Sequence, residues 1–304
     1  MRKYDERDTI FSRMARKEFT NEYNDYYSKN SEKEIIDKNL RKNLPIASKG
    51  KRFYEPLKSP IVDAAFNLLS DLKKFAECNS VFINKTEGSA EEFTEIIKET
   101  AKLYGAEKIG ITKSDSQFYY SHRGRTDDVY GNEINYGELP NTIVFAVPMN
   151  EKMIKKAPKT EESIATTHGY VQSAIVALMV AYTIRQWGYN ARAHIDGNYL
   201  NILPIAAEIA GIGELGMHGL LITEEFGPKI RLSGVSTDIP LVYDMPSKKE
   251  QEKICLECMK CVKACPSKAI TGNFGMPINS EKCFGKWLEF GTDCGVCLSV
   301  CSNR

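Results

Sequence analysis

The stretch ICLECMKCVKACPSKAI, residues 254–270, holds four cysteines with the spacing Cys-x2-Cys-x2-Cys-x3-Cys-Pro. Three thiolates at this spacing bind one [4Fe–4S] cluster, and the fourth, just before proline, reaches a second cluster. Four more cysteines follow, so eight of the nine cysteines of the chain lie in its last fifty residues. The sequence therefore predicts two [4Fe–4S] clusters in a small C-terminal domain.

This crossover divides the eight thiols into two predicted ligand sets. One cluster is expected on Cys255, Cys258, Cys261 and Cys301. The other is expected on Cys265, Cys283, Cys294 and Cys297. Because bacterial ferredoxins carry the same spacing, residues 246–304 are predicted to form a ferredoxin-like domain.

Disulfides and zinc explain the cysteines less well than clusters do. Disulfide frameworks belong to small secreted chains, whereas the first 250 residues here contain only Cys78. Structural zinc would suit two Cys-x2-Cys pairs, but it has no use for an unbroken run of four cysteines before proline. Two neighbouring clusters conduct electrons, so we expect the rest of the chain to contain a site that consumes them.

The composition excludes several classes of protein. The chain has 304 residues, 42% hydrophobic and 27% charged, which is ordinary for a globular protein. A net charge of +1 gives no reason to expect a nucleic-acid partner. The sequence contains no apolar run of about 18 residues, so no membrane-spanning helix is predicted.

The charged N-terminus has neither a secretory signal nor a twin-arginine leader, so the chain as written is expected in the cytoplasm. If a twin-arginine leader was removed, the expectation becomes an exported, membrane-associated protein.

Patterns of hydrophobicity divide the rest of the chain. Residues 1–60 are too polar for a core of their own and are predicted to be an arm that wraps the body. Residues 61–245 are predicted to form an α/β layered domain, because helical and strand patterns alternate there. The expected helices cover 61–75, 89–105, 161–187 and 199–211. The expected strands cover 107–112, 141–149, 189–195, 219–223 and 229–242.

Four segments resemble the catalytic subunit of the corrinoid-dependent reductive dehalogenases, and more distantly epoxyqueuosine reductase. They are the opening DERDTIFSRMARKEFTNEYNDYY, THGYVQSAIVALMVAYTIRQWGYNARAHIDGN at 167–198, GIGELGMHGLLITEEFGPKIRLSGVSTDIPL at 211–241, and the cysteine domain. The resemblance implies an α+β or α/β fold: a nitroreductase-like domain that binds base-off cobalamin, followed by the ferredoxin-like domain. It implies the reductive dehalogenation of a small organohalide. It also implies an external electron-donor protein, and it leaves open a homodimer and, for an exported protein, a membrane-anchor partner.

The resemblance assigns roles to individual residues. Tyr170 matches the proton donor of the family, and Asn198 matches a polar residue that orients it. Arg231, with Lys229 as the nearby rival, matches the basic residue that stabilises the tyrosinate. Thr166 matches a position that lines the cofactor pocket. Trp287 is expected either to cover the substrate pocket or to shield a cluster.

The glycine-rich stretch 210–219 is the predicted contact with the corrinoid. These glycines follow a helix rather than a strand, so the segment lacks the context of a dinucleotide-binding loop. The expected cofactor contacts are Gly211, Gly213, Gly216, Gly219 and His218. None of the four histidines lies in an Asp-x-His-x-x-Gly pattern, so no histidine is expected to ligate cobalt.

Two other functions remain open at this point. An epoxyqueuosine-reductase-like enzyme would act on a modified tRNA base and would favour a basic surface, which the near-neutral charge does not. A non-catalytic iron–sulfur electron carrier would use the clusters alone, and it would contain iron and sulfide without a corrinoid.

Overall fold

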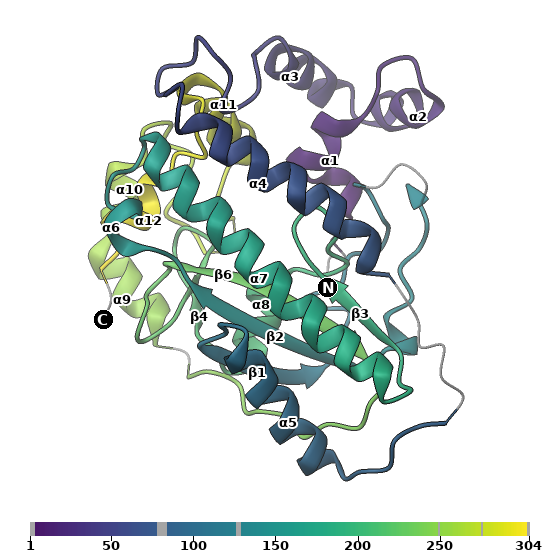
Figure 1. Cartoon of the computed structure of the whole chain (residues 1–304). Helices are drawn as coiled ribbons and strands as arrows, with labels where there is room; N and C mark the ends of the chain where they lie inside the picture. Colours follow the sequence, from purple (N-terminus) through teal and green to yellow (C-terminus); the bar gives the residue numbers. More distant parts are fainter. Residues whose placement is uncertain (1–3, 78–83, 126–128, 249, 275, 303–304) are drawn as a thin grey trace.

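The computed structural model describes residues 4–77, 84–125, 129–248, 250–274 and 276–302 (Figure 1). Cys78 lies outside the described residues. The chain starts with an arm of short helices, η1 (Glu6–Asp8), α1 (Ile10–Ala15), α2 (Asn21–Lys29) and α3 (Ser31–Arg41). It ends with the helices that carry the cysteines, α9 (Gln251–Cys258), α10 (Lys260–Ala264), α11 (Ser280–Phe290) and α12 (Val296–Val300).

A four-stranded sheet lies between these ends of the chain. Its strand order is β1 (Lys108–Lys113), β2 (Asn141–Pro148), β6 (Ile230–Thr237) and β3 (Ala191–His194), and each neighbouring pair is antiparallel. The alternation of helices and strands predicted the layers. The alternation did not determine whether neighbouring strands are parallel or antiparallel, because a helix between two strands can connect either arrangement.

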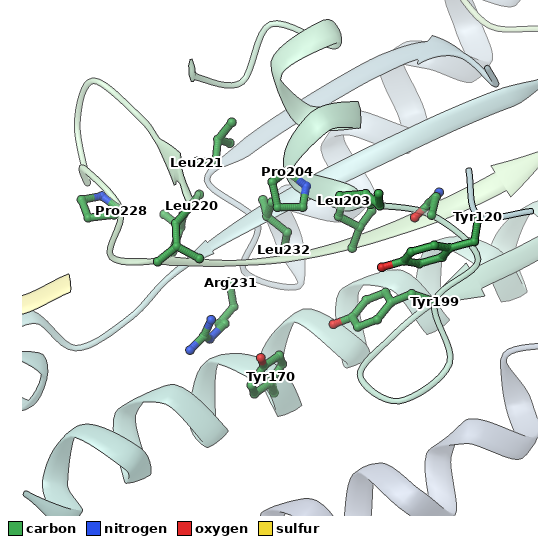
Figure 2. A pocket seen from close by; sticks show the side chains of 13 residues that line it. Tyr120, Tyr170, Tyr199, Leu203, Pro204, Leu220, Leu221, Pro228, Arg231 and Leu232 are labelled. Carbon is green, nitrogen blue, oxygen red and sulfur yellow. The ribbon is translucent and has the colours of Figure 1, made fainter. Parts of the chain in front are cut away.

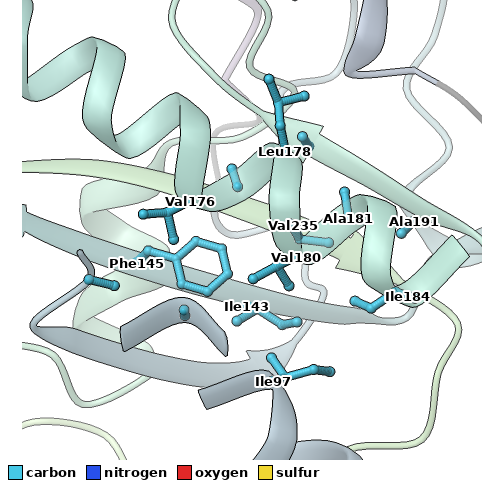
Figure 3. Packing of buried hydrophobic residues seen from close by; sticks show 14 of the residues in the cluster. Ile97, Ile143, Phe145, Val176, Leu178, Val180, Ala181, Ile184, Ala191 and Val235 are labelled. Carbon is cyan, nitrogen blue, oxygen red and sulfur yellow. The ribbon is translucent and has the colours of Figure 1, made fainter. Parts of the chain in front are cut away.

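Helices cover both faces of this sheet. On one face the sheet is covered by α5 (Ala90–Leu103) and the long α7 (Thr160–Gln186), and α4 (Ser59–Leu72) packs on α7 (Figure 1). On the other lies α8 (Leu203–Ile209), which contacts β2 and β6. Strand β2 serves both cores: Ile143 and Phe145 pack toward α7 (Figure 3), and Val144 and Ala146 pack toward α8. The apolar run at 141–149 is therefore buried on both faces, as predicted.

Other elements match the expected ones with shifted ends. The helix expected at 89–105 begins with the predicted capping box, in which Ser89 and Glu92 bond each other's backbone N–H. The helix expected at 199–211 starts only at Leu203. The strand expected at 219–223 shrinks to β5 (Leu221–Ile222), which pairs with β4 (Glu214–Leu215). The remaining short elements are η2 (Lys73–Phe75), η4 (Tyr136–Glu138) and α6 (Glu151–Ile154).

Helix α7 is long and apolar enough to cross a membrane by length and composition. Most of its apolar window, 61%, is buried inside the protein. The helix lies between the sheet and helices α4 and α5, so its apolar composition follows from its central place in the core (Figure 1).

Candidate active site

The structure brings the four thiols of one predicted ligand set to a common cavity. Cys255, Cys258, Cys261 and Cys301 line one cavity of about 300 Å³, the thiol cavity, together with Met217 and His218. Burial raises the pKa of Cys301 to about 11, with contributions from the three neighbouring thiols. These four side chains therefore face one another although Cys301 is 40 residues beyond Cys261 in the sequence.

The second group shows the same mutual influence. Burial raises the pKa of Cys283 to about 11, with a contribution from Cys265. Burial raises the pKa of Cys294 to about 12, with a contribution from Cys283. The pKa of Cys297 is raised by burial and by both Cys283 and Cys294. Within the described ranges, no three His, Cys, Asp or Glu side chains converge closely enough for a single metal ion.

Tyr170 and Arg231 form the centre of the candidate site. Tyr170 lies in the middle of α7, and Arg231 lies at the start of β6, directly opposite. The guanidinium carbon of Arg231 lies 4.4 Å from the centre of the Tyr170 ring (Figure 2). Burial raises the pKa of Tyr170 above its ordinary value, and the positive charge of Arg231 opposes this shift most strongly. The phenol is therefore protonated at neutral pH, with a cation in place to stabilise its anion.

A chain of contacts connects Arg231 to the second thiol group. Arg231 Nη2 donates a 3.1 Å hydrogen bond to Thr166 Oγ1, and Thr166 Oγ1 donates one of 3.1 Å to Glu162 Oε1. A Cβ on Gly295, between Cys294 and Cys297, would lie 2.1 Å from Glu162 Oε1, so this contact requires glycine. Thr166 thus holds Arg231 in place.

The carboxyl group of Glu162 shares this buried region with Asp293. Burial raises the pKa of Glu162 well above its ordinary value, and the neighbouring Asp293 raises it further. Asp293 accepts a 2.5 Å hydrogen bond from Ser163 Oγ, and one of its oxygens lies 4.0 Å from Arg231. Sequence reasoning missed this pair, because two acidic residues 131 positions apart carry no local signal.

Tyr170 separates two cavities. The first, the sheet cavity, has a volume of about 230 Å³ and lies between β6, α7 and the loop after β3 (Figure 2). Its walls are mostly aliphatic, with phenols at one end; the lining residues include Tyr120, Tyr199, Asn201, Leu203, Leu220, Pro228, Arg231 and Leu232. Burial raises the pKa of Tyr120 to about 12 and that of Tyr199 well above its usual value. Neither phenol was predicted.

The second, the aromatic cavity, has a volume of about 300 Å³. It brings together residues of the arm, of α4, of α7, of the cysteine domain and of two loops, namely Phe11, Pro45, Ile46, Phe66, Arg125, Tyr170, Asp196, Phe284, Trp287, Leu288 and Asp293. Trp287 thus lies in the wall of a cavity that also contains Tyr170.

Asn198 and Lys229, which also have predicted catalytic roles, have hydrogen-bond or ion-pair partners other than Tyr170. Asn198 is buried, and its Oδ1 accepts hydrogen bonds of 2.6 Å from Arg192 and 2.9 Å from Arg123. It therefore anchors the loop that presents Tyr199. Of the two basic candidates, Arg231 contacts Tyr170, whereas Lys229 forms an ion pair of 3.1 Å with Glu151.

The predicted cofactor contacts in the glycine-rich stretch pack largely against the protein itself. A Cβ on Gly211 would lie 2.3 Å from the carbonyl oxygen of Met245, and one on Gly213 would lie 2.3 Å from that of Ile222. Gly216 faces the Ile222 side chain, and Gly219 has a φ of +72° that favours glycine. Close packing within the chain thus accounts for these glycines.

His218 is buried in the wall of the thiol cavity. Its Nδ1 accepts a hydrogen bond from the backbone N–H of Leu220, which places the proton on Nε2. In the described structure this buried Nε2 has no hydrogen-bond partner. Burial lowers the pKa of His218 to about 4, so the ring is neutral at pH 7.

Gly169 allows Arg231 to approach α7, and we predict that Gly169→Ala lowers activity. A Cβ there would lie 2.6 Å from Arg231 Cγ, so the guanidinium would have to leave the Tyr170 ring. The matched control is Gly285→Ala in α11, where the nearest atom is 3.5 Å away. The control should stabilise the protein by roughly 0.5–1 kcal/mol without loss of activity. Turnover and thermal unfolding of both variants test this; equal activities would contradict it.

Comparison with known proteins gives a consistent set of relatives, although no family model matches the chain. Tetrachloroethene reductive dehalogenases from Desulfitobacterium hafniense and Sulfurospirillum multivorans are 30% and 29% identical to it, over 70% and 69% of its length. These matches cover 48% and 50% of the relatives, so the chain spans about half their length. The resemblance found in the sequence is thereby confirmed.

Solved structures and a second group of relatives agree. A catabolic reductive dehalogenase has a similar fold, with a TM-score of 0.73 and 22% identity, over 88% of this chain and 38% of that one. An epoxyqueuosine reductase from Prochlorococcus marinus is 35% identical over 115 residues, which is 31% of this chain and 34% of that protein.

Proposed function

The chain is a homologue of the reductive dehalogenases, which are oxidoreductases, and we propose that it replaces a carbon–halogen bond of an organohalide by a carbon–hydrogen bond. The reaction consumes two electrons and one proton and releases a halide ion. A low-potential electron-donor protein would supply the electrons one at a time. The observation that carries this proposal is the position of Tyr170, a protonated phenol between two cavities with Arg231 against its ring.

The residues present fit the cofactors that this reaction needs. The two thiol groups supply four ligands each for two [4Fe–4S] clusters. For the corrinoid, the sheet cavity offers apolar walls together with buried polar atoms that have no partner in the described structure, namely both amide atoms of Asn201 and Nε of Arg231. Such atoms can form hydrogen bonds with the amide side chains at the edge of a corrin ring.

The size of the sheet cavity adds a condition. At about 230 Å³ it is smaller than the roughly 300–1,000 Å³ usual for small-molecule sites. Binding a corrinoid therefore requires the walls of this cavity to move apart. When bound, the clusters supply one-electron transfer, and the corrinoid supplies a cobalt centre that reduces the carbon–halogen bond.

The residues of the chain itself manage the proton. Tyr170 Oη donates it to the carbon that loses the halide, and the charge left on the phenolate is stabilised by Arg231. Thr166 and Glu162 keep the guanidinium in place. Asn198 acts as a positioning residue through the loop that it anchors.

The crossover of the cysteine ligands leads to a separate prediction about the iron content of cysteine variants. Cys301→Ser should weaken the same cluster as Cys255→Ser, because these thiols line one cavity. Each change should lower the iron content from about eight to about four per chain and remove the same EPR signal. Cys78→Ser, at the ninth cysteine, is the control and should keep about eight. The pairing would be wrong if Cys301→Ser gave the spectrum of Cys297→Ser.

Anaerobic reconstitution with iron, sulfide and cobalamin tests the proposed function. We expect about eight irons and one base-off cobalt per chain by metal analysis and EPR, and halide release from an organohalide when a reduced viologen supplies electrons. Protein that binds iron and sulfide but no cobalamin would instead be an electron carrier.

A further inference from the structure

His218 has a buried N–H group without a hydrogen-bond partner. The residue is 1% exposed, and its Nδ1 accepts the backbone N–H of Leu220 at 3.2 Å, so the ring proton is on Nε2. In the part of the chain that the structure describes, Nε2 has no partner. A buried donor that is left unpaired loses its hydration without compensation, so native proteins rarely keep one. An acceptor supplied by a bound group would remove this cost.

Close packing and one hydrogen bond hold the His218 ring in place. A Cβ on Gly216 would lie 2.8 Å from His218 Cε1, so glycine at this position makes room for the imidazole. The next residue, Met217, is completely buried in an apolar cluster that also contains Ile222. The ring cannot turn over without losing the bond between Nδ1 and Leu220. The free N–H is therefore at the distal end of a fixed ring.

The thiol cavity contains His218 together with the four cysteines of the first predicted ligand set. Of the described residues that line this cavity, only His218 has a buried N–H without a partner. Gln251, in the same wall, donates a hydrogen bond of 3.4 Å to Cys255 Sγ, so the cavity already directs one donor at a ligand sulfur. Four cysteines complete the ligand set of a [4Fe–4S] cluster, so the imidazole would donate to the cluster rather than ligate iron.

A hydrogen-bond donor in this cavity would change the reduction potential of the cluster. Reduction adds a negative charge to the cluster and its thiolates, and a hydrogen bond to sulfur stabilises the more negative state. The effect is strengthened by burial, because a low dielectric makes each hydrogen bond electrostatically stronger. Removal of the donor should therefore make the cluster harder to reduce.

We propose that His218 Nε2 donates a hydrogen bond to the [4Fe–4S] cluster held by the four cysteines of the thiol cavity, and that this bond raises the reduction potential of that cluster. The sequence predicted His218 as a corrinoid contact, whereas the cavity that it shares with the thiols favours a role at the cluster. The inference rests on the two-cluster part of the proposed function. It does not depend on the corrinoid or on dehalogenation.

A redox titration of the reconstituted protein, followed by EPR, measures the potentials of both clusters. His218→Phe keeps an aromatic ring but has no N–H. At the midpoint potential of the wild-type cluster, the variant should have an about tenfold lower ratio of reduced to oxidised cluster. For a one-electron couple this factor corresponds to a potential about 59 mV lower. The potential of the second cluster should not change, so it serves as the internal reference.

Two conservative variants separate the N–H donor from the shape of the side chain. The amide nitrogen of glutamine can take the place of Nε2, whereas the amide oxygen of asparagine can take the place of Nδ1 and accept the Leu220 N–H. His218→Gln should therefore keep most of the wild-type potential, and His218→Asn should have the lowered one. The matched control is His168→Phe, because His168 is exposed on α7 and outside the thiol cavity. This variant should keep the wild-type potential.

Electron–nuclear double resonance of the reduced cluster, in protein reconstituted in D2O, gives an independent readout of the hydrogen bond. One exchangeable hydrogen coupled to the cluster should be present in the wild type and in His218→Gln, and absent in His218→Phe and His218→Asn. Equal potentials and equal couplings in the wild type, His218→Gln and His218→Asn would overturn the inference. A shift of the same size in both clusters would also overturn it.

Iron analysis and halide release distinguish this inference from the proposed function. Protein without about eight irons per chain would refute the two-cluster part of the proposed function, and the inference with it. About eight irons with a potential that does not depend on the donor would overturn the inference alone. A potential lowered in His218→Asn and restored in His218→Gln, in protein that releases no halide, would support the inference and refute the dehalogenase.

Discussion

Tyr170→Phe should lower the rate of dehalogenation by about 10²- to 10⁴-fold while both kinds of cofactor stay bound, because a positioned general acid contributes about that factor. The substitution removes one oxygen and keeps the ring under Arg231. The thiol groups and the partnerless atoms of the sheet cavity are unchanged. Halide release, iron and cobalt content, and the EPR spectrum of the variant together test the assignment.

The matched control lies in the same helix. Tyr182 is 39% exposed, and the guanidinium of Arg185 lies 4.9 Å from the centre of its ring, so the local chemistry resembles that at Tyr170. Tyr182→Phe should keep the wild-type rate. Full activity in Tyr170→Phe would refute the proton-donor role.

The pH dependence follows from the direction of the pKa shift. The folded-state pKa of Tyr170 is raised above its ordinary value of about 10, chiefly by burial. The phenol therefore stays protonated through neutral and mildly alkaline pH, and it loses its proton only as the pH rises through the raised value. The rate should not fall from this cause between pH 7 and about 9. The same ionisation should reduce stability only above about pH 10.

Local patterns predicted much of the fold. The capping box at Ser89 and the apolar run at 141–149 each report on a few neighbouring residues, and both are confirmed. The directions of the strands and the late start of α8 at Leu203 were not predicted, since they depend on packing between distant segments.

In the candidate site too, local sequence patterns predicted some features, and features that depend on distant segments were not predicted from them. The cysteine spacing placed Cys255, Cys258, Cys261 and Cys301 in one predicted ligand set, and these four residues line one cavity. Tyr170 and Arg231, 61 positions apart, were paired only through the family resemblance. The sequence did not predict that Arg125 and Phe11 line one cavity, since only the folded arm brings them together.

Arg13→Ala should destabilise the protein by about 3–5 kcal/mol, because it leaves the buried carboxylate of Asp37 without its positively charged partner. The Arg13 side chain is 2% exposed and that of Asp37 is fully buried. Arg13 donates hydrogen bonds of 2.9 and 2.6 Å to the two oxygens of Asp37, and one of 2.6 Å to Glu281 in α11. Together they join α1, α3 and the cysteine domain.

Arg7→Ala is the control, since its partner Asp5 is more exposed and the loss should stay below about 1 kcal/mol. The double variant Arg13→Met with Asp37→Leu should recover much of the stability, because it removes both buried charges. Urea unfolding of the three variants measures these differences, and equal losses for Arg13→Ala and Arg7→Ala would contradict the prediction. Because Phe11 and Arg13 share α1, release of the arm would also change the wall of the aromatic cavity.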